Sequence, residues 1–215
     1  MLELAREPHM TPPAIRLAIS AAATVILTAA CGSSTTSPGT APSANTFHAE
    51  VADPAGDAIA SAGVLNPPDL VHGTVDVAGG SVTFNIQFAA GTFDRQSTRV
   101  SIELDIDQSS ATGIGGAGLG IDYVLDMWAP TNQAKVQQAM PAACAAGGPC
   151  YGDTASVALT FGVDSMTASV PLGLLGNASG RLNYRVFAYL SPQTTTPITV
   201  ADVMPDINLA AAHAP

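Results

Sequence analysis

Apolar and polar residues alternate repeatedly between residues 82 and 188 of this 215-residue chain. Alternation with a period of two places apolar side chains on one face of an extended strand and polar side chains on the other. Short turns separate the segments, and Gly79-Gly80 is typical of a hairpin turn. The pattern therefore predicts an all-β domain, an antiparallel β-sandwich of jelly-roll-like type. The clearest segments are residues 82–88, 100–107, 121–127, 157–163, 166–170 and 182–188.

Three segments do not follow this alternation clearly. Residues 132–140 predict a short helix or an irregular excursion, and residues 198–204 a final short element. Residues 113–118 match Gly-x-Gly-x-x-Gly, but a strand pattern follows them instead of the helix that a dinucleotide site requires. This stretch is therefore interpreted as a flexible glycine loop.

The N-terminal part of the chain has the pattern of an export signal. Residues 17–30 are uncharged, follow Arg16, and are shorter than the roughly 20 residues that span a bilayer. We predict a signal peptide over residues 1–30, which begins at Met1 or at Met10. Residues 31–46 are mostly Ser, Thr, Pro, Gly and Ala, so they predict a disordered linker ahead of a domain at residues 47–215.

Residues 27–31, Leu-Thr-Ala-Ala-Cys, resemble the lipobox of a bacterial lipoprotein. The usual pattern has leucine where this chain has Thr28. The resemblance implies that Cys31 carries a diacylglyceryl group, that its new amino group takes a further acyl chain such as palmitate, and that these anchor the protein to the cell membrane or envelope. Two or more chains give a stable anchor where one is marginal. The alternative is cleavage and secretion without lipidation.

The chain is acidic, with a net charge of −10 that removal of residues 1–30 leaves unchanged. Such a surface repels nucleic acid and anionic lipid, so we expect no nucleic-acid partner. In an exported chain, Cys144 and Cys150 predict a disulfide. It closes a short loop, so its expected contribution is about 2–3 kcal/mol.

Aspartates carry most of the negative charge and form two groups in the sequence. The first group is Asp53, Asp57 and Asp69, and the second is Asp105 with Asp107. Ca²⁺ binds six to eight oxygens from carboxylates and loop carbonyls, which either group offers in part. The alternative is that these side chains cap turns in solvent.

The order of these motifs resembles the β-sandwich domains related to family 9 carbohydrate-binding modules, within the DOMON-like group. The resemblance covers most of residues 47–206 and implies a β-sandwich with structural Ca²⁺ near Asp53, Asp57, Asp105 and Asp107. The matching segments are Asp53 to Asp57, Asp69-Leu70, Leu104 to Gly113, Asp122-Tyr123 and Asp202 to Asp206.

Sugar binding requires exposed aromatic faces, and few aromatic residues fall outside the predicted core. Trp128, Arg185, Phe187 and Tyr189 are the candidates for a ligand-binding face, since the last three share one parity on a strand. The alternative is that this face contacts the second sheet.

The sequence shows no catalytic set. The first hypothesis is therefore a surface-anchored, non-enzymatic binding module with structural Ca²⁺, whose ligand is a glycan or a cell-envelope protein. The second is a glycan-active hydrolase that uses Asp or Glu. The third is a carrier of haem or another small ligand, in which Met127 and His72 are the candidate haem ligands.

Overall fold

The computed structural model describes residues 46–59, 66–116, 118–176, 178–190, 199–206 and 210–214. The predicted signal peptide, Cys31 and all but the last residue of the predicted linker lie outside the described residues. In the described residues, no helix has both the length and the apolar character needed to cross a membrane.

The described residues form an antiparallel, all-β fold, which confirms the predicted fold class. One short α-helix, α1 (Pro141–Ala145), and two 3₁₀ turns, Ala129–Thr131 and Leu172–Leu175, accompany the strands. The strands are β1 (Phe47–Ala52), β2 (Leu70–Ala78), β3 (Ser81–Phe88), β4 (Arg99–Asp105), β5 (Ile114–Gly116), β6 (Leu119–Ile121), β7 (Tyr123–Trp128), β8 (Gln133–Ala139), β9 (Tyr151–Phe161), β10 (Ser165–Pro171), β11 (Leu182–Leu190), β12 (Thr199–Met204) and β13 (Ala212–Ala214).

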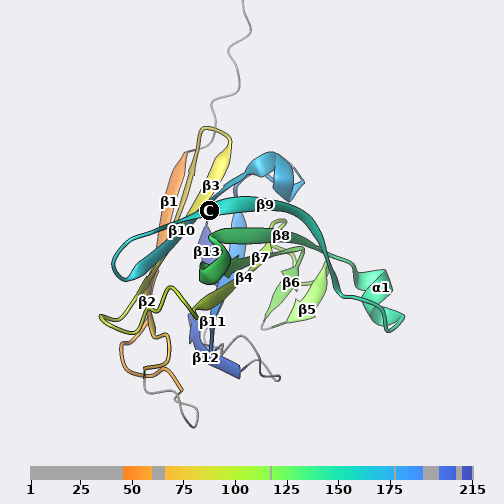
Figure 1. Ribbon diagram of the computed structural model, residues 1–215. Coiled ribbons are helices and arrows are strands. Elements are labelled where there is room, and N and C mark those ends of the chain that lie inside the picture. The colour runs from red at the N-terminus through yellow and green to blue at the C-terminus, as the bar shows by residue number, and fades with distance from the viewer. Residues whose placement is uncertain are drawn as a thin grey trace, which may run out of the picture. The chain divides into compact units, whose positions relative to one another are not determined.

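The large sheet has the strand order β1-β2-β3-β10-β9-β8-β7-β4-β11-β12, and β13 pairs with β11. Strand β9 joins its two halves, because residues 151–158 pair with β8 and residues 159–161 pair with β10. Figure 1 shows β9 running across both halves. At the far ends, β12 contacts β2 and β13 contacts β1, so the sheet nearly closes on itself.

The hydrophobic core lies between the two halves of this sheet. Alternating residues of β2, β3 and β10 on one side meet those of β4, β7 and β11 on the other. Phe84 of β3 and Tyr184 of β11, for example, make an edge-to-face contact with ring centroids 6.3 Å apart. This packing buries most of the apolar positions that the alternation predicted. Val163 of the predicted segment 157–163 is instead 90% exposed, because β9 ends at Phe161.

Two of the predictions for the less regular segments are wrong. Residues 133–139 form β8, which pairs with both β7 and β9 and buries Ala134 and Val136. Residues 114–116 and 119–121 form the β5–β6 hairpin instead of a flexible loop. A Cβ on Gly120 would collide with the carbonyl oxygens of Ser109 and Thr112, so glycine lets this hairpin pack against the preceding loop. The final element predicted at residues 198–204 corresponds to β12.

The predicted disulfide is confirmed. Cys144 of α1 is bonded to Cys150, which directly precedes β9. The bond closes the excursion between β8 and β9, where the Met140 amide also donates to the Cys150 carbonyl over 2.8 Å. It therefore acts as a local cross-link at the surface.

Candidate metal centres and ligand-binding face

Four aspartates from three separate segments meet beside the start of β2, and we call them the first acidic cluster: Asp53, Asp57, Asp69 and Asp202. Asp53 follows β1, Asp57 lies in the loop after it, and Asp202 belongs to β12. Carboxylate oxygens of Asp53, Asp57 and Asp202 all lie within 4.8 Å of one another. Strand β12 pairs with β11 and contacts β2, and this contact brings Asp202 to the cluster.

Asp69 is buried against the same loop. Its side chain accepts a hydrogen bond at Oδ2 from the Gly56 amide over 2.8 Å, so the carboxylate faces the Asp53–Asp57 loop. Asp69 is 5% exposed, and its Oδ1 has no hydrogen-bond partner among the described residues. The same holds for Oδ2 of Asp53. Buried oxygens without a donor are costly, so these two atoms mark where the cluster lacks a partner among the described residues.

Backbone amides hold Asp202 in its orientation. Its Oδ2 accepts from the Leu70 amide over 2.6 Å, and its Oδ1 accepts from the Val203 amide over 2.7 Å. The Leu70 bond connects β12 to the first residue of β2. A fixed carboxylate of this kind loses little entropy when it binds a metal, since its rotamer is already set.

The electrostatics of the first acidic cluster favour positive charge. Burial, with added repulsion from Asp202 and Asp57, raises the pKa of Asp53 to about 7. Burial also raises the pKa of Asp202 to about 6, although the Leu70 and Val203 amides act against that shift. Raised pKa values for both carboxyl groups are the expected consequence of acids packed together without a cation.

These pKa shifts predict how pH affects the calcium-free protein. Raised pKa values mean that the folded state binds more protons than the unfolded state between about pH 4 and pH 7. Its stability should therefore fall as pH rises through this range. We expect urea denaturation of metal-stripped protein in Ca²⁺-free buffer to give a lower midpoint at pH 8 than at pH 5. A Ca²⁺-free midpoint that rises over this range would contradict the assignment.

The second acidic cluster consists of Asp105, Asp107 and Asp122, whose oxygens also lie within 4.8 Å of one another. Asp105 ends β4, Asp107 lies just beyond it, and Asp122 lies between β6 and β7. These carboxylates accept bonds from neighbouring groups, which include the Ser109 and Ile106 amides. Burial is the main cause of the raised pKa of Asp122.

A cavity of about 290 Å³ adjoins the second acidic cluster. It has room for a hydrated cation or a small polar ligand. Its lining includes Asp107, Asp122, Tyr123, Gln138 and Pro141.

The structure brings the five predicted aspartates into two clusters and adds a member to each. Asp53, Asp57 and Asp69 join Asp202, and Asp105 with Asp107 join Asp122. Sequence spacing did not assign Asp202 or Asp122 as ligands, because each comes from a segment brought in by strand pairing. Both residues do occur in the motifs that carry the family resemblance, which was the available signal.

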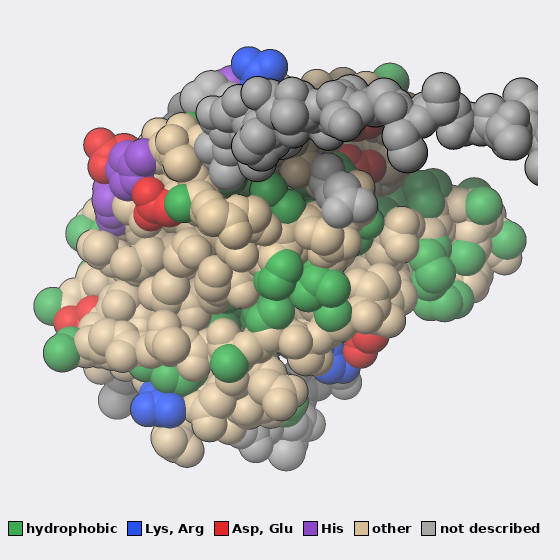
Figure 2. All heavy atoms as spheres, turned by 90° about the horizontal axis from the view of Figure 1, so that it is seen from above, with side chains coloured by type: hydrophobic (Ala, Val, Ile, Leu, Met, Phe, Trp, Pro, Cys, Tyr) green, Lys and Arg blue, Asp and Glu red, His purple; other side chains and the backbone are tan. Residues whose placement is uncertain are grey.

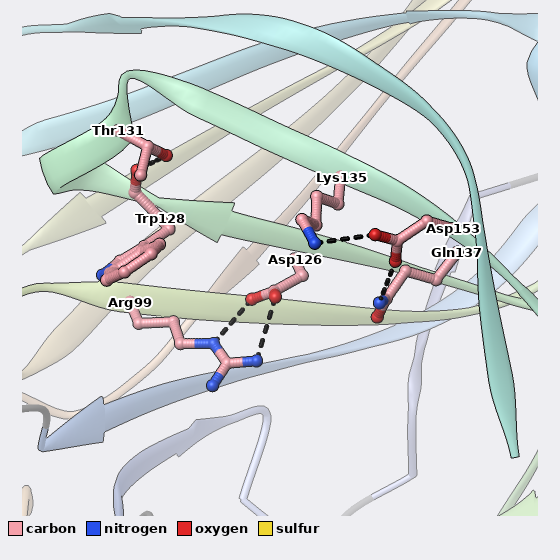
Figure 3. A network of polar contacts seen from close by, with 7 residues as sticks. All are labelled: Arg99, Asp126, Trp128, Thr131, Lys135, Gln137 and Asp153. Atoms are coloured by element: carbon pink, nitrogen blue, oxygen red, sulfur yellow. Dashed lines mark hydrogen bonds and ion pairs between the residues drawn. The ribbon is translucent and has the colours of Figure 1, made fainter. Parts of the chain in front are cut away.

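The outer face of β11, β4 and β7 presents a row of neighbouring side chains. Tyr189 pairs in register with Arg99, and Arg99 with Trp128. The Arg99 guanidinium carbon lies 5.6 Å from the centre of the Tyr189 ring. Trp128 is 36% exposed, and Figure 3 shows its indole beside Arg99. We call Tyr189, Arg99, Trp128 and Asp126 the outer-face row.

Ion pairs keep this face polar and ordered. Arg99 donates two hydrogen bonds to Asp126, from Nε over 2.7 Å and from an Nη over 2.9 Å (Figure 3). On the adjoining strands, Lys135 and Gln137 both donate to Asp153, over 2.7 and 2.6 Å. The bidentate geometry fixes the Arg99 plane, and Asp126 raises the pKa of Arg99.

The other two predicted ligand residues are buried on the same side of β11. Arg185 is 1% exposed and donates to the carbonyl oxygens of Pro205 and Asp206 over 2.9 and 2.7 Å. Phe187 is also buried. Both side chains are buried and are not open to a ligand, so the ligand-binding prediction now depends on Trp128 and Tyr189.

The two candidate haem ligands are not brought together. Met127 is fully buried in the core between the sheet halves. His72 lies on the outer face of β2, where its Nε2 approaches Glu50 over 3.4 Å. The structure therefore offers no support for haem ligation by this pair.

No family model matches this chain, and a search of curated proteins finds no relative. The geometry of the two acidic clusters and of the outer-face row is therefore the evidence on which a function is inferred.

Proposed function

We propose that this protein is a non-enzymatic binding module stabilised by Ca²⁺, which takes a glycan or a cell-envelope protein on the outer face of β4, β7 and β11. The observation that carries the proposal is the outer-face row, in which an exposed tryptophan lies next to a rigid Arg–Asp pair.

The outer-face row suits a sugar ring in particular. Strands lie about 4.8 Å apart, so Tyr189 and Trp128 are separated by roughly 10 Å across β4. The C–H face of a pyranose packs on an aromatic ring, and its hydroxyls hydrogen-bond to charged groups beside that ring. Arg99 lies on the strand between the two rings, and Asp126 lies on the same strand as Trp128. Together they offer hydrogen-bond donors and acceptors in fixed positions.

The first acidic cluster supports structural Ca²⁺. Asp53, Asp57, Asp69 and Asp202 would hold the ion, because they combine hard oxygen donors with two buried oxygens that have no donor among the described residues. The ion would tie the loop after β1 to β12 and thus connect the two ends of the sheet. Asp105, Asp107 and Asp122 offer a second, smaller donor set.

Anchoring through Cys31 remains part of the proposal. The resemblance of residues 27–31 to a lipobox supports it. Metabolic labelling of the protein with a palmitate analogue tests it, with Cys31→Ser as the control that should remove the label. Label retained by that variant would contradict lipidation at Cys31.

Ligand binding should depend on the outer-face row. We expect a glycan array, together with a pull-down from cell envelopes, to identify a ligand whose affinity falls at least tenfold in Trp128→Ala. The Tm should change little, because Trp128 is partly exposed. Val163→Ala is the control, since Val163 is 90% exposed in the β9–β10 turn and should bind as wild type does. Equal binding by Trp128→Ala would place the ligand elsewhere.

A further inference from the structure

Histidine and carboxylate side chains gather on the outer face of β1 and β2, and none of them belongs to the acidic clusters or to the outer-face row. His48 pairs in register with Asp76, and Ala52 with His72, so alternation puts His48, Glu50, His72 and Asp76 on one surface. Figure 2 shows histidine and acidic side chains side by side at the edge where Figure 1 places these strands. We call these four residues the β1–β2 histidine cluster.

Both imidazoles lie near one carboxylate oxygen. His72 Nε2 lies 3.4 Å from Glu50 Oε2, and His48 Nε2 lies 3.9 Å from the same oxygen. Ligand atoms around a tetrahedral metal, bound at about 2.0–2.1 Å, are separated by about 3.4 Å. The His72–Glu50 pair already has this separation, whereas the His48–Glu50 pair is wider, so the His48 side chain has to move closer for all three donors to surround one ion.

The other nitrogen of His48 has a defined role. Its Nδ1 lies 2.6 Å from Asp76 Oδ1. An ionised carboxylate only accepts hydrogen bonds, so Nδ1 carries the proton, and Nε2 is the nitrogen that a metal would bind when the ring is neutral. This is the carboxylate–histidine arrangement that orients imidazole ligands in metal sites and makes them more basic.

The chemistry of this cluster differs from that of the acidic clusters. Imidazole nitrogen favours Zn²⁺, Cu²⁺ and similar ions, whereas sets made only of carboxylates favour Ca²⁺. After residue 30 the chain has three histidines and two glutamates, and two of those histidines meet at one of those glutamates. The side chains of His48, Glu50 and His72 also retain 56%, 66% and 29% exposure, so a metal has open access.

We propose that His48, Glu50 and His72 form a surface site for a divalent transition metal of the Zn²⁺ class, with Asp76 as a positioning residue. Three protein ligands leave a fourth position open to water or to a group from a partner. The site is on the edge strand pair and does not depend on the calcium or ligand-binding proposals.

Calorimetric titration of Zn²⁺ into the purified, chelator-treated protein tests the site. Saturating Ca²⁺ is present to occupy the acidic clusters, and the pH is 8 to favour neutral imidazoles. We expect one equivalent to bind, and each of His48→Gln, Glu50→Gln and His72→Gln to weaken it at least tenfold. His213→Gln is the matched control, because His213 lies on β13 and should leave the affinity within twofold of wild type.

Two further measurements distinguish this site from adventitious binding. Co²⁺ in place of Zn²⁺ should give the visible absorption of a tetrahedral ion, and His72→Gln should lose it. Asp76→Ala should weaken Zn²⁺ binding by 10- to 100-fold, whereas Asp76→Asn keeps an acceptor oxygen and should restore most of the affinity. Absence of Zn²⁺ binding in wild type, or equal binding by all three ligand variants, would overturn the proposal.

Discussion

Removal of Ca²⁺ with EGTA is expected to lower the Tm of this protein by about 5–10 °C. A ligand present at a hundred times its Kd stabilises the folded state by about 2.7 kcal/mol, and a domain of this size shifts by about 2–4 °C per kcal/mol. The physical reason is that the ion would replace donors missing around the buried oxygens of Asp53 and Asp69. Differential scanning calorimetry in Ca²⁺ and in EGTA measures the effect.

Variants of the first acidic cluster sharpen this test. Asp53→Asn should remove the calcium-dependent shift. It should also melt above calcium-free wild type, because it removes a half-buried acid that Asp202 and Asp57 repel. Asp164→Asn is the matched control, since this half-buried aspartate lies in the β9–β10 turn, belongs to neither acidic cluster and should keep the full shift. A Tm that EGTA does not change would remove the calcium proposal.

The same calorimetric experiment tests the second acidic cluster separately from the first. Asp107→Asn alters an exposed ligand candidate without disturbing the buried Asp105. A partial loss of the calcium-dependent shift in Asp107→Asn would show that both clusters bind an ion. A full shift would restrict structural Ca²⁺ to the first acidic cluster.

Truncation of the central core residue should have the largest effect on folding. Phe84 is fully buried on β3, pairs in register with Val75 of β2 and Ala168 of β10, and contacts Tyr184 in the opposite half. We expect Phe84→Ala to lower the free energy of unfolding by about 3–5 kcal/mol, from lost apolar burial and the cavity left behind. Urea denaturation measures the change.

The control for this substitution is again Val163→Ala. Val163 is 90% exposed, so its truncation should alter the free energy of unfolding by less than about 0.5 kcal/mol. A loss of under 1 kcal/mol in Phe84→Ala would mean that β3 and β11 do not enclose a common core in solution.

The sequence predicted strands well wherever large apolar residues alternate with polar ones. The segments that became β3, β4 and β11 are of this kind, and their parity also predicted which side chains face the core. The pattern did not predict β8, where the buried positions are Ala134 and Val136. Alanine differs too little in hydrophobicity from the residues around it for the alternation to be visible. There, hydrogen bonding to strands on both sides decides the structure.

The prediction for the segment that forms the β5–β6 hairpin was wrong for a related reason. Its glycines are typical of flexible loops, yet Gly120 packs against backbone that only the folded chain brings near. Local composition does not reveal such a contact, because the carbonyl groups concerned belong to a different segment.

The same difference between local pattern and tertiary contact applies to the candidate sites. Asp53, Asp57, Asp105 and Asp107 were predictable because they lie close together in the sequence, on loops next to strands. Asp202 and Asp122 were not assigned, because strand pairing brings them to their clusters from elsewhere in the chain. The burial of Arg185 likewise depends on carbonyl oxygens some twenty residues away.

The sequence by itself determined the all-β class, the parity of the regular strands, the disulfide pair and the acidic character of the surface. Each of these follows from local periodicity, composition or spacing. The tertiary structure alone decided which carboxylates share a cluster, which aromatic rings lie beside Arg99, and which histidines meet at Glu50. Those juxtapositions depend on strand order and register, which arise from packing between residues far apart in the chain.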